Sequence, residues 1–237
     1  MSFNKQNNIY TIIYIVVLVA IVGTGLAFTS MALRSRQQEN EDADKMRQIL
    51  LSVRISKTGN EVIPTFNNVI KSQLIVNVQG DSIGFDAFAV DVATENKLPV
   101  EQRQLPVYIA DINGETKYIL PVRGNGLWGP IWGYISFNSD GSTIYGAYFA
   151  HEGETPGLGA EIEKPAFSDQ FQGKNIFKGN EFLPVNVLKV GTKPLKGEDY
   201  VDAVSGGTIT SKGVAEMMDK GLSPYEAYLR KVSNLSK

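Results

Sequence analysis

A long stretch without a charged side chain, from Ile9 to Leu33, constrains this chain more than any other feature. A helix needs about 20 apolar residues to cross the hydrocarbon core of a bilayer, so this stretch can span a membrane with some tilt. The apolar core of a cleaved signal peptide is shorter, about 7–15 residues, and ends at a small-residue cleavage site. We therefore predict a short tail at residues 1–8 and an uncleaved, single-pass membrane anchor at residues 9–33.

The charges beside this anchor give a weak indication of its orientation. Lys5 and the N-terminal amine flank one end, whereas Arg34 and Arg36 flank the other. The positive-inside rule then favours a cytoplasmic C-terminal domain, but long domains are translocated largely regardless of charge. Charge alone leaves the orientation open.

Residues 34–56 read as a juxtamembrane linker followed by a helix. The segment 37–45 is polar and acidic. Apolar residues then recur at helical spacing, which predicts an amphipathic helix from about residue 41 to 56. The remaining residues, 57–237, are predicted to form one domain, which begins with a short helix and a strand between residues 62 and 78.

The middle of this domain has the pattern of an antiparallel sheet. Short segments rich in β-branched and aromatic residues predict strands at 107–109, 117–122, 131–137, 143–149 and, later, 185–190. Asn113-Gly114 and Asp140-Gly141 are dipeptides typical of hairpin turns. Between residues 131 and 137, apolar residues alternate, which directs one set of side chains to a core.

Two helices are predicted to follow these strands. One covers about residues 211–220, with Thr210 or Ser211 as its N-cap. The other opens at Ser223-Pro-Tyr-Glu226, which fits a capping box, and runs to about Val232. The predicted fold class is α+β: a single transmembrane helix, then a domain with an antiparallel sheet and flanking helices.

Composition excludes several functions. The chain has no cysteine, so thiolate catalysis, disulfides and cysteine-held iron–sulfur clusters are absent from it. A formal net charge of -2 and the lack of a basic stripe argue against nucleic-acid binding. No Gly-x-Gly-x-x-Gly fingerprint lies between a strand and a helix, so a dinucleotide site is not expected either.

The segment before the first of these two helices combines a carboxylate, hydroxyls and paired glycines in the order Asp202-Ala-Val-Ser205-Gly206-Gly207-Thr208-Ile-Thr210. Paired glycines let a bulky group approach the main chain closely. A helix N-terminus presents free N–H groups and a partial positive charge, which suits a phosphate. By itself the segment is equally consistent with a glycine-rich turn leading into a capped helix.

This segment resembles the flavin-attachment motif of the FMN-binding subunits of sodium-translocating NADH:quinone oxidoreductase and of the related Rnf complexes. Asp202, Ser205, Gly206 and Thr208 match the motif, while Gly207 replaces its usual Ala. The resemblance implies that Thr208 carries FMN through a phosphoester bond. Lys212 is a candidate counter-charge for the phosphate, or else a solvated surface lysine.

Two further glycine-rich loops support the resemblance. One, Gly126-Leu-Trp128-Gly129, is similar to the sodium-pump protein more than to its Rnf counterpart; alone it also fits a bulged strand entry with its tryptophan in a core. The other is Glu154-Thr155-Pro156-Gly157-Leu158-Gly159, which resembles the second signature loop of the family. The resemblance implies that the Thr155 hydroxyl and the backbone around Gly157, Leu158 and Gly159 lie against the flavin. Trp128, with the glycines beside it, would supply an apolar wall for a flat aromatic ligand.

The only histidine, His151, precedes the second loop. It could bind a metal together with Glu152 or Glu154, but one imidazole beside carboxylates more often forms a structural hydrogen-bonded pair, and we predict no metal site.

The resemblance covers essentially the whole chain and implies an electron-carrying subunit of a sodium-pumping NADH:quinone oxidoreductase. Its expected partners are other membrane, flavin and iron–sulfur subunits, and a flavin transferase that attaches FMN. The expected location is the bacterial inner membrane, with the domain on the periplasmic side, opposite to the charge indication. The alternatives are an Rnf-type electron-transport protein and a non-enzymatic, membrane-anchored FMN-binding module.

Overall fold

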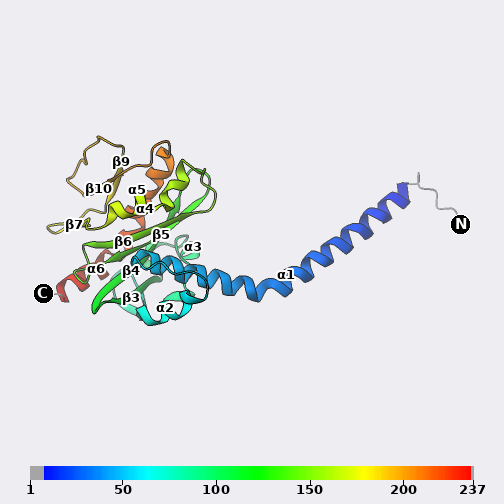
Figure 1. Cartoon of the computed structure of the whole chain (residues 1–237), viewed down its shortest axis with the longest axis horizontal. Helices are drawn as coiled ribbons and strands as arrows, with labels where there is room; N and C mark the ends of the chain where they lie inside the picture. The colour runs from blue at the N-terminus through cyan, green and yellow to red at the C-terminus, as the bar shows by residue number, and fades with distance from the viewer. Residues whose placement is uncertain (1–7, 236–237) are drawn as a thin grey trace. The chain divides into compact units, whose positions relative to one another are not determined.

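The computed structural model describes residues 8–235, so the predicted tail lies, apart from Asn8, outside the described residues. The chain divides into two compact units, residues 1–45 and 46–237. The described part of the first unit belongs to one continuous helix, α1 (Asn8–Ser52), whose last residues form part of the second unit (Figure 1). Within residues 8–235, α1 is the one helix long and apolar enough to span a membrane, and the apolar side chains of the stretch that could span it are exposed.

The predicted linker at residues 37–45 is wrong, because α1 continues through it. This segment holds no glycine or proline and is rich in Glu, Gln, Asp and Lys, most of which a helix accommodates well. Gln38 Nε2 also donates to Asp42 Oδ1 one helical turn away. The helix ends at Ser52 rather than near residue 56, because Arg54 takes a positive φ of 64°.

A six-stranded antiparallel sheet forms the centre of the second unit, in the order β2-β1-β3-β4-β5-β6 (Figure 1). Its strands are β1 (Ile70–Val76), β2 (Ser82–Gly84), β3 (Leu105–Ile112), β4 (Glu115–Asn125), β5 (Pro130–Phe137) and β6 (Ile144–His151). Two small sheets pair β7 (Phe177–Lys178) with β8 (Glu181–Phe182), and β9 (Asn186–Leu188) with β10 (Tyr200–Asp202).

Helices cover both faces of the six-stranded sheet. They are α2 (Val62–Val69), α3 (Val92–Glu95), α4 (Pro165–Ser168), α5 (Thr208–Leu222) and α6 (Glu226–Leu235), with short 3₁₀ helices at Gly59–Glu61, Ala87–Ala89, Val100–Gln102, Gly159–Glu163, Asp169–Phe171 and Ser223–Tyr225. One buried cluster contains residues of α5 and α6, and a second contains residues of α2 and the end of α1. The predicted α+β fold with an antiparallel sheet and flanking helices is confirmed.

Neighbouring residues of one strand enter different clusters, as the pleat of a strand requires. Ile131, Ile135 and Phe137 belong to the α5 cluster, whereas Tyr134 belongs to the α2 cluster. The predicted alternation in this strand is therefore confirmed.

The two predicted turns differ in length. Asn113 and Gly114 both have positive φ, 55° and 84°, and join the paired residues Ile112 and Glu115, so they form a two-residue type I′ hairpin turn. Asp140 and Gly141 instead sit in a longer loop between β5 and β6, where Asp140 Oδ1 accepts hydrogen bonds from the Ser142 and Thr143 N–H groups.

Both predicted helix caps are wrong. The N-cap of α5 is Gly207, so the helix begins at Thr208, and the hydroxyls of Thr210 and Ser211 bond elsewhere. Ser223 is the C-terminal cap of α5 rather than part of a capping box, because its Oγ donates to the Asp219 carbonyl. The strand predicted at 185–190 is shorter, and the sequence gives no signal for its parallel partner β10.

Candidate functional site

Three loops that are far apart in the sequence meet in one hollow of about 340 Å³. They are the loop between β4 and β5, the loop after β6, and the turn that begins α5. The hollow is lined by Leu127, Trp128, Glu154, Thr155, Leu158, Gly159, Gly206, Gly207, Thr208, Ile209 and Thr210. Its size falls in the range of about 300–1,000 Å³ that is usual for ligand sites.

Most of the predicted site residues line this hollow, and four do not. Asp202 lies on β10, where its N–H donates to Gln170 Oε1. Gly157 shapes the second loop, with a φ of 76° and an N–H that donates to Glu161 Oε1. Ser205 and Lys212 are exposed beside the hollow's turn but do not contribute to its lining.

Glycines let the loops approach one another closely. Gly206 has a φ of 74°, and a Cβ built on it would lie 2.5 Å from Leu158 Cδ2. A Cβ on Gly207 would lie 3.3 Å from the Gly159 Cα atom. The turn that begins α5 therefore packs directly on the second signature loop, and the positive φ of Gly206 strains any other residue at this position.

The hydroxyl groups of this turn have different environments. Thr208 is exposed at the first position of α5, a helix of 15 residues. Thr210 and Ser211 are both 1% exposed, and each side chain is engaged: Thr210 donates to Glu154 Oε2, and Ser211 Oγ accepts from the Val204 N–H. Among the hydroxyls of this turn, Thr208 is thus the one that both lines the hollow and is exposed to an incoming group.

The start of α5 places a partial positive charge beside Thr208. The first N–H groups of a helix have no carbonyl within the helix to bind, and they carry a partial positive charge. A phosphate at Thr208 would face these groups.

The two tryptophans have separate roles. Trp128 is 67% exposed and lines the hollow together with the exposed Leu127 and Ile209. Trp132 packs against the buried cluster that contains the end of α1. There its Nε1 donates to Gln48 Oε1 at 2.9 Å, and the Arg123 guanidinium lies over its ring. An apolar wall for a flat ligand is therefore available at Trp128 and not at Trp132.

His151 has a structural environment. Its Nδ1 accepts a hydrogen bond from the Glu154 N–H at 3.2 Å, and its Nε2 lies 3.9 Å from Glu163 Oε1. Within residues 8–235, no three His, Cys, Asp or Glu side chains are grouped so that they could hold a metal ion.

Sequence reasoning missed Glu154 and Thr210 as parts of the site. Glu154 belongs to the second signature loop, but its sequence position suggests only a metal ligand, and that of Thr210 suggests only a helix cap. Both are buried, Glu154 at 5% exposure and Thr210 at 1%. Only the pairing of these side chains in space identifies them.

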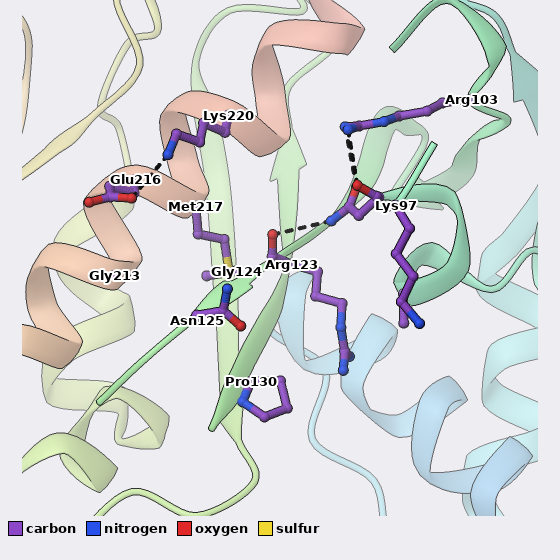
Figure 2. A pocket seen from close by; sticks show the side chains of 12 residues that line it. Lys97, Arg103, Arg123, Gly124, Asn125, Pro130, Gly213, Glu216, Met217 and Lys220 are labelled. Carbon is purple, nitrogen blue, oxygen red and sulfur yellow. Dashed lines mark hydrogen bonds and ion pairs between the residues drawn. The ribbon is translucent and has the colours of Figure 1, made fainter. Parts of the chain in front are cut away.

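A second hollow, of about 550 Å³, lies where the end of β4 and the start of β5 meet α5, and is lined by four basic side chains (Figure 2). Two of them are committed to structural bonds: Lys220 pairs with Glu216 at 3.1 Å, and Arg103 Nη2 donates to the Asn96 carbonyl. It contains no hydroxyl side chain and none of the predicted site residues. The smaller hollow is therefore the better candidate.

Comparisons with known proteins agree with this choice. The family described as FMN-binding domain matches residues 126–223, a range that contains all three loops of the smaller hollow. The C subunit of the Na(+)-translocating NADH-quinone reductase of Vibrio anguillarum is 31% identical over 97% of this chain and 98% of its own length. The chain belongs to the family of Na(+)-translocating NADH-quinone reductase C subunits.

Other members of the C-subunit family give the same result. The Pseudomonas aeruginosa protein is 30% identical over 95% of this chain and 96% of its own length. A crystal structure of the Parabacteroides distasonis protein shares 51% identity and superposes with a TM-score of 0.79, covering 83% of this chain and 96% of that one. The family that the three signature loops indicated is confirmed.

The residues of the smaller hollow suit FMN. An exposed hydroxyl at a helix start can hold the phosphate, and an apolar wall with close backbone approach can receive a flat ring. Thr208, Trp128 and the glycines at 206 and 207 provide these features.

Proposed function

We propose that this chain carries FMN on Thr208 through a phosphoester bond and relays electrons within a sodium-translocating NADH:quinone oxidoreductase. The observation that carries the proposal is the contrast between Thr208, exposed in the hollow at the start of α5, and the buried, hydrogen-bonded Thr210 and Ser211. FMN supplies the redox chemistry, while the protein supplies position and electrostatics.

Attachment requires a second protein. No His–Asp pair lies beside Thr208 in the sequence to activate its hydroxyl. A flavin transferase would provide the base and Mg²⁺. Thr208 Oγ1 would attack the flavin-side phosphorus of FAD, the pyrophosphate P–O bond would break with AMP as the leaving group, and the hydroxyl proton would pass to the transferase. Asp202 and Ser205, which lie outside the hollow, would then belong to the segment that the transferase recognises.

The remaining steps of the reaction belong to partner subunits. One apolar anchor without an intramembrane charge cannot form a sodium path, because ion paths need polar groups that face a protein interior. Other subunits would oxidise NADH, reduce quinone and conduct sodium. The FMN-binding domain would lie on the periplasmic side of the inner membrane, where the covalent bond prevents loss of the flavin.

The function is tested in membranes that contain the whole complex. We expect Thr208→Ala to abolish NADH-driven quinone reduction and sodium transport. Thr192→Ala, which removes the side chain of an exposed threonine outside both the motif and the lining of the hollow, should leave both at the wild-type level. A Thr208→Ala complex that still reduces quinone and transports sodium would contradict the proposal. Flavin that dissociates on denaturation would favour a non-enzymatic FMN-binding module instead.

A further inference from the structure

One carboxylate is buried at the flavin hollow. Among the residues whose burial is described, Glu154 is the only buried acidic side chain, with 5% exposure. Its Oε1 accepts a hydrogen bond from the Trp128 N–H at 2.8 Å, and its Oε2 accepts one from the Thr210 hydroxyl. Burial of a carboxylate is costly unless it is hydrogen-bonded, so these two donors account for its presence there.

The two donors come from different parts of the hollow. Trp128 lies in the loop between β4 and β5, and Thr210 lies in the first turn of α5, two residues after Thr208. Glu154 itself belongs to the third loop. One side chain therefore connects all three segments that line the hollow.

Glycines surround this carboxylate because no space is left for a side chain. A Cβ on Gly126 would overlap Glu154 Oε1, and a Cβ on Gly159 would overlap both Glu154 Oε2 and Thr210 Oγ1. Two glycines of the signature loops are thus explained by the position of the carboxylate rather than by contact with a ligand. A shift of the β4–β5 loop or of the second signature loop would therefore break a hydrogen bond to Glu154 or create an overlap with its carboxylate.

We propose that Glu154 is a positioning residue that fixes the distance between the Trp128 wall and the Thr208 attachment point, and whose charge tunes the flavin. The inference rests on the proposed attachment of FMN to Thr208. The inference assigns Glu154 no contact with the phosphate and no part in the attachment reaction. Glu154 positions the two segments through the two hydrogen bonds that its carboxylate accepts.

The charge has a separate, measurable consequence. Reduction adds negative charge to a flavin, and a nearby carboxylate in a poorly solvated position opposes that addition. Glu154 lines the hollow, so removal of its charge should raise the midpoint potential of the flavin. Glu154→Gln keeps the size of the side chain and an oxygen that can accept from Trp128, so this variant removes the charge with little change in packing.

The experiment uses the full chain, purified after co-production with a flavin transferase. It compares wild type with Glu154→Gln, Glu154→Ala and Thr210→Val. The matched control is Glu152→Gln, which neutralises an exposed carboxylate two residues away in the same loop, where solvent screens the charge. For each protein, mass spectrometry gives the fraction that carries FMN, redox titration gives the midpoint potential, and fluorescence anisotropy reports flavin mobility.

We expect Glu154→Gln to retain FMN and shift the midpoint potential upward. Glu154→Ala and Thr210→Val should each lower flavin anisotropy. In the double variant, which combines the two substitutions, the fall in anisotropy should be smaller than the sum of the two single falls, because both substitutions remove the same contact. Glu152→Gln should match wild type. Wild-type potential and anisotropy in all Glu154 variants, with FMN on Thr208, would overturn this inference alone. A wild-type protein without FMN on Thr208 would overturn the proposed function and this inference with it.

Discussion

Thr210 donates a hydrogen bond to the carboxylate of Glu154, 56 residues earlier in the chain, and this contact distinguishes Thr210 from Thr208, the last residue of the attachment motif. Thr210 is held inside the protein by it, while Thr208 remains exposed in the hollow. The motif indicates Thr208 as the acceptor, but it does not describe the environment of either hydroxyl. The contact therefore connects the signature sequence to the choice of an acceptor.

Gly206 is expected to be essential for the shape of the flavin turn. Gly206→Ala would force alanine into a φ of 74° and place its Cβ 2.5 Å from Leu158 Cδ2. The backbone strain alone costs about 1–2 kcal/mol, and the overlap adds to it. We expect a clear fall in FMN loading, measured by mass spectrometry. Gly197→Ala is the matched control, with a φ of 78° but no atom within 4 Å of the added Cβ. Equal loading in both variants would show that the contact with Leu158 is irrelevant.

Gly207 is the one position at which the attachment motif departs from the pattern that it resembles. Its φ is -102°, which alanine adopts without strain. A Cβ there would lie 3.1 Å from Val204 Cγ1 and 3.3 Å from the Gly159 Cα atom, so these neighbours would have to move by only a few tenths of an ångström. We expect Gly207→Ala to load FMN as fully as wild type and to change the free energy of unfolding by less than about 1 kcal/mol. A large loss of loading would mean that glycine is required at this N-cap.

Asp140 should make stability depend on pH. Burial by itself would raise the pKa of Asp140, but the hydrogen bonds from Thr143 and Ser142 outweigh burial and lower it from the ordinary value of 3.8. A lowered folded-state pKa gives stability that is present above about pH 4 and is lost as the pH falls through the folded value.

Removing this charge should therefore lower stability above about pH 4 and matter little in acid. We expect Asp140→Asn to lower the free energy of unfolding by roughly 1–2 kcal/mol at pH 7, because hydrogen bonds to a charged acceptor are the stronger ones. The difference from wild type should shrink below about pH 4. Denaturant unfolding in detergent at several pH values measures it, with the exposed Asp219→Asn as control. A difference that stays constant into acid would contradict the assignment.

The absence of cysteine makes the orientation of the domain directly testable. A single Lys193→Cys substitution places a thiol on an exposed loop of the second unit. We expect a membrane-impermeant maleimide to label this thiol in intact cells with a permeabilised outer membrane, because the domain is proposed to be periplasmic. Labelling only after the inner membrane is broken would place the domain in the cytoplasm, as the charges of Arg34 and Arg36 would suggest.

Local patterns predicted much of the fold. The charge-free stretch predicted the long apolar helix, and Asn113-Gly114 predicted a tight hairpin turn, because each feature depends on neighbouring residues only. The predicted boundaries of α1 and α5 were wrong. The polar residues after the anchor also permit a helix, so α1 continues through them. Gly207 is the N-cap of α5 although hydroxyl residues follow it.

The site was predictable in part. The three signature loops identified most of the residues that line the hollow, through resemblance to a family. The roles of Glu154 and Thr210 could not be predicted, because a hydrogen bond between side chains 56 residues apart leaves no local pattern in the sequence. The same holds for the parallel pairing of β9 with β10, which positions Asp202 beside Gln170 and away from the hollow.

Peptide mass spectrometry after denaturation tests the central claim most directly. The full chain is co-produced with a flavin transferase, and wild type is compared with Thr208→Ala and Thr210→Val. We predict an added mass of FMN minus one water on the peptide that contains Thr208, in wild type and in Thr210→Val, and no added mass in Thr208→Ala. Flavin that washes off on denaturation, or an added mass that persists in Thr208→Ala, would contradict the account.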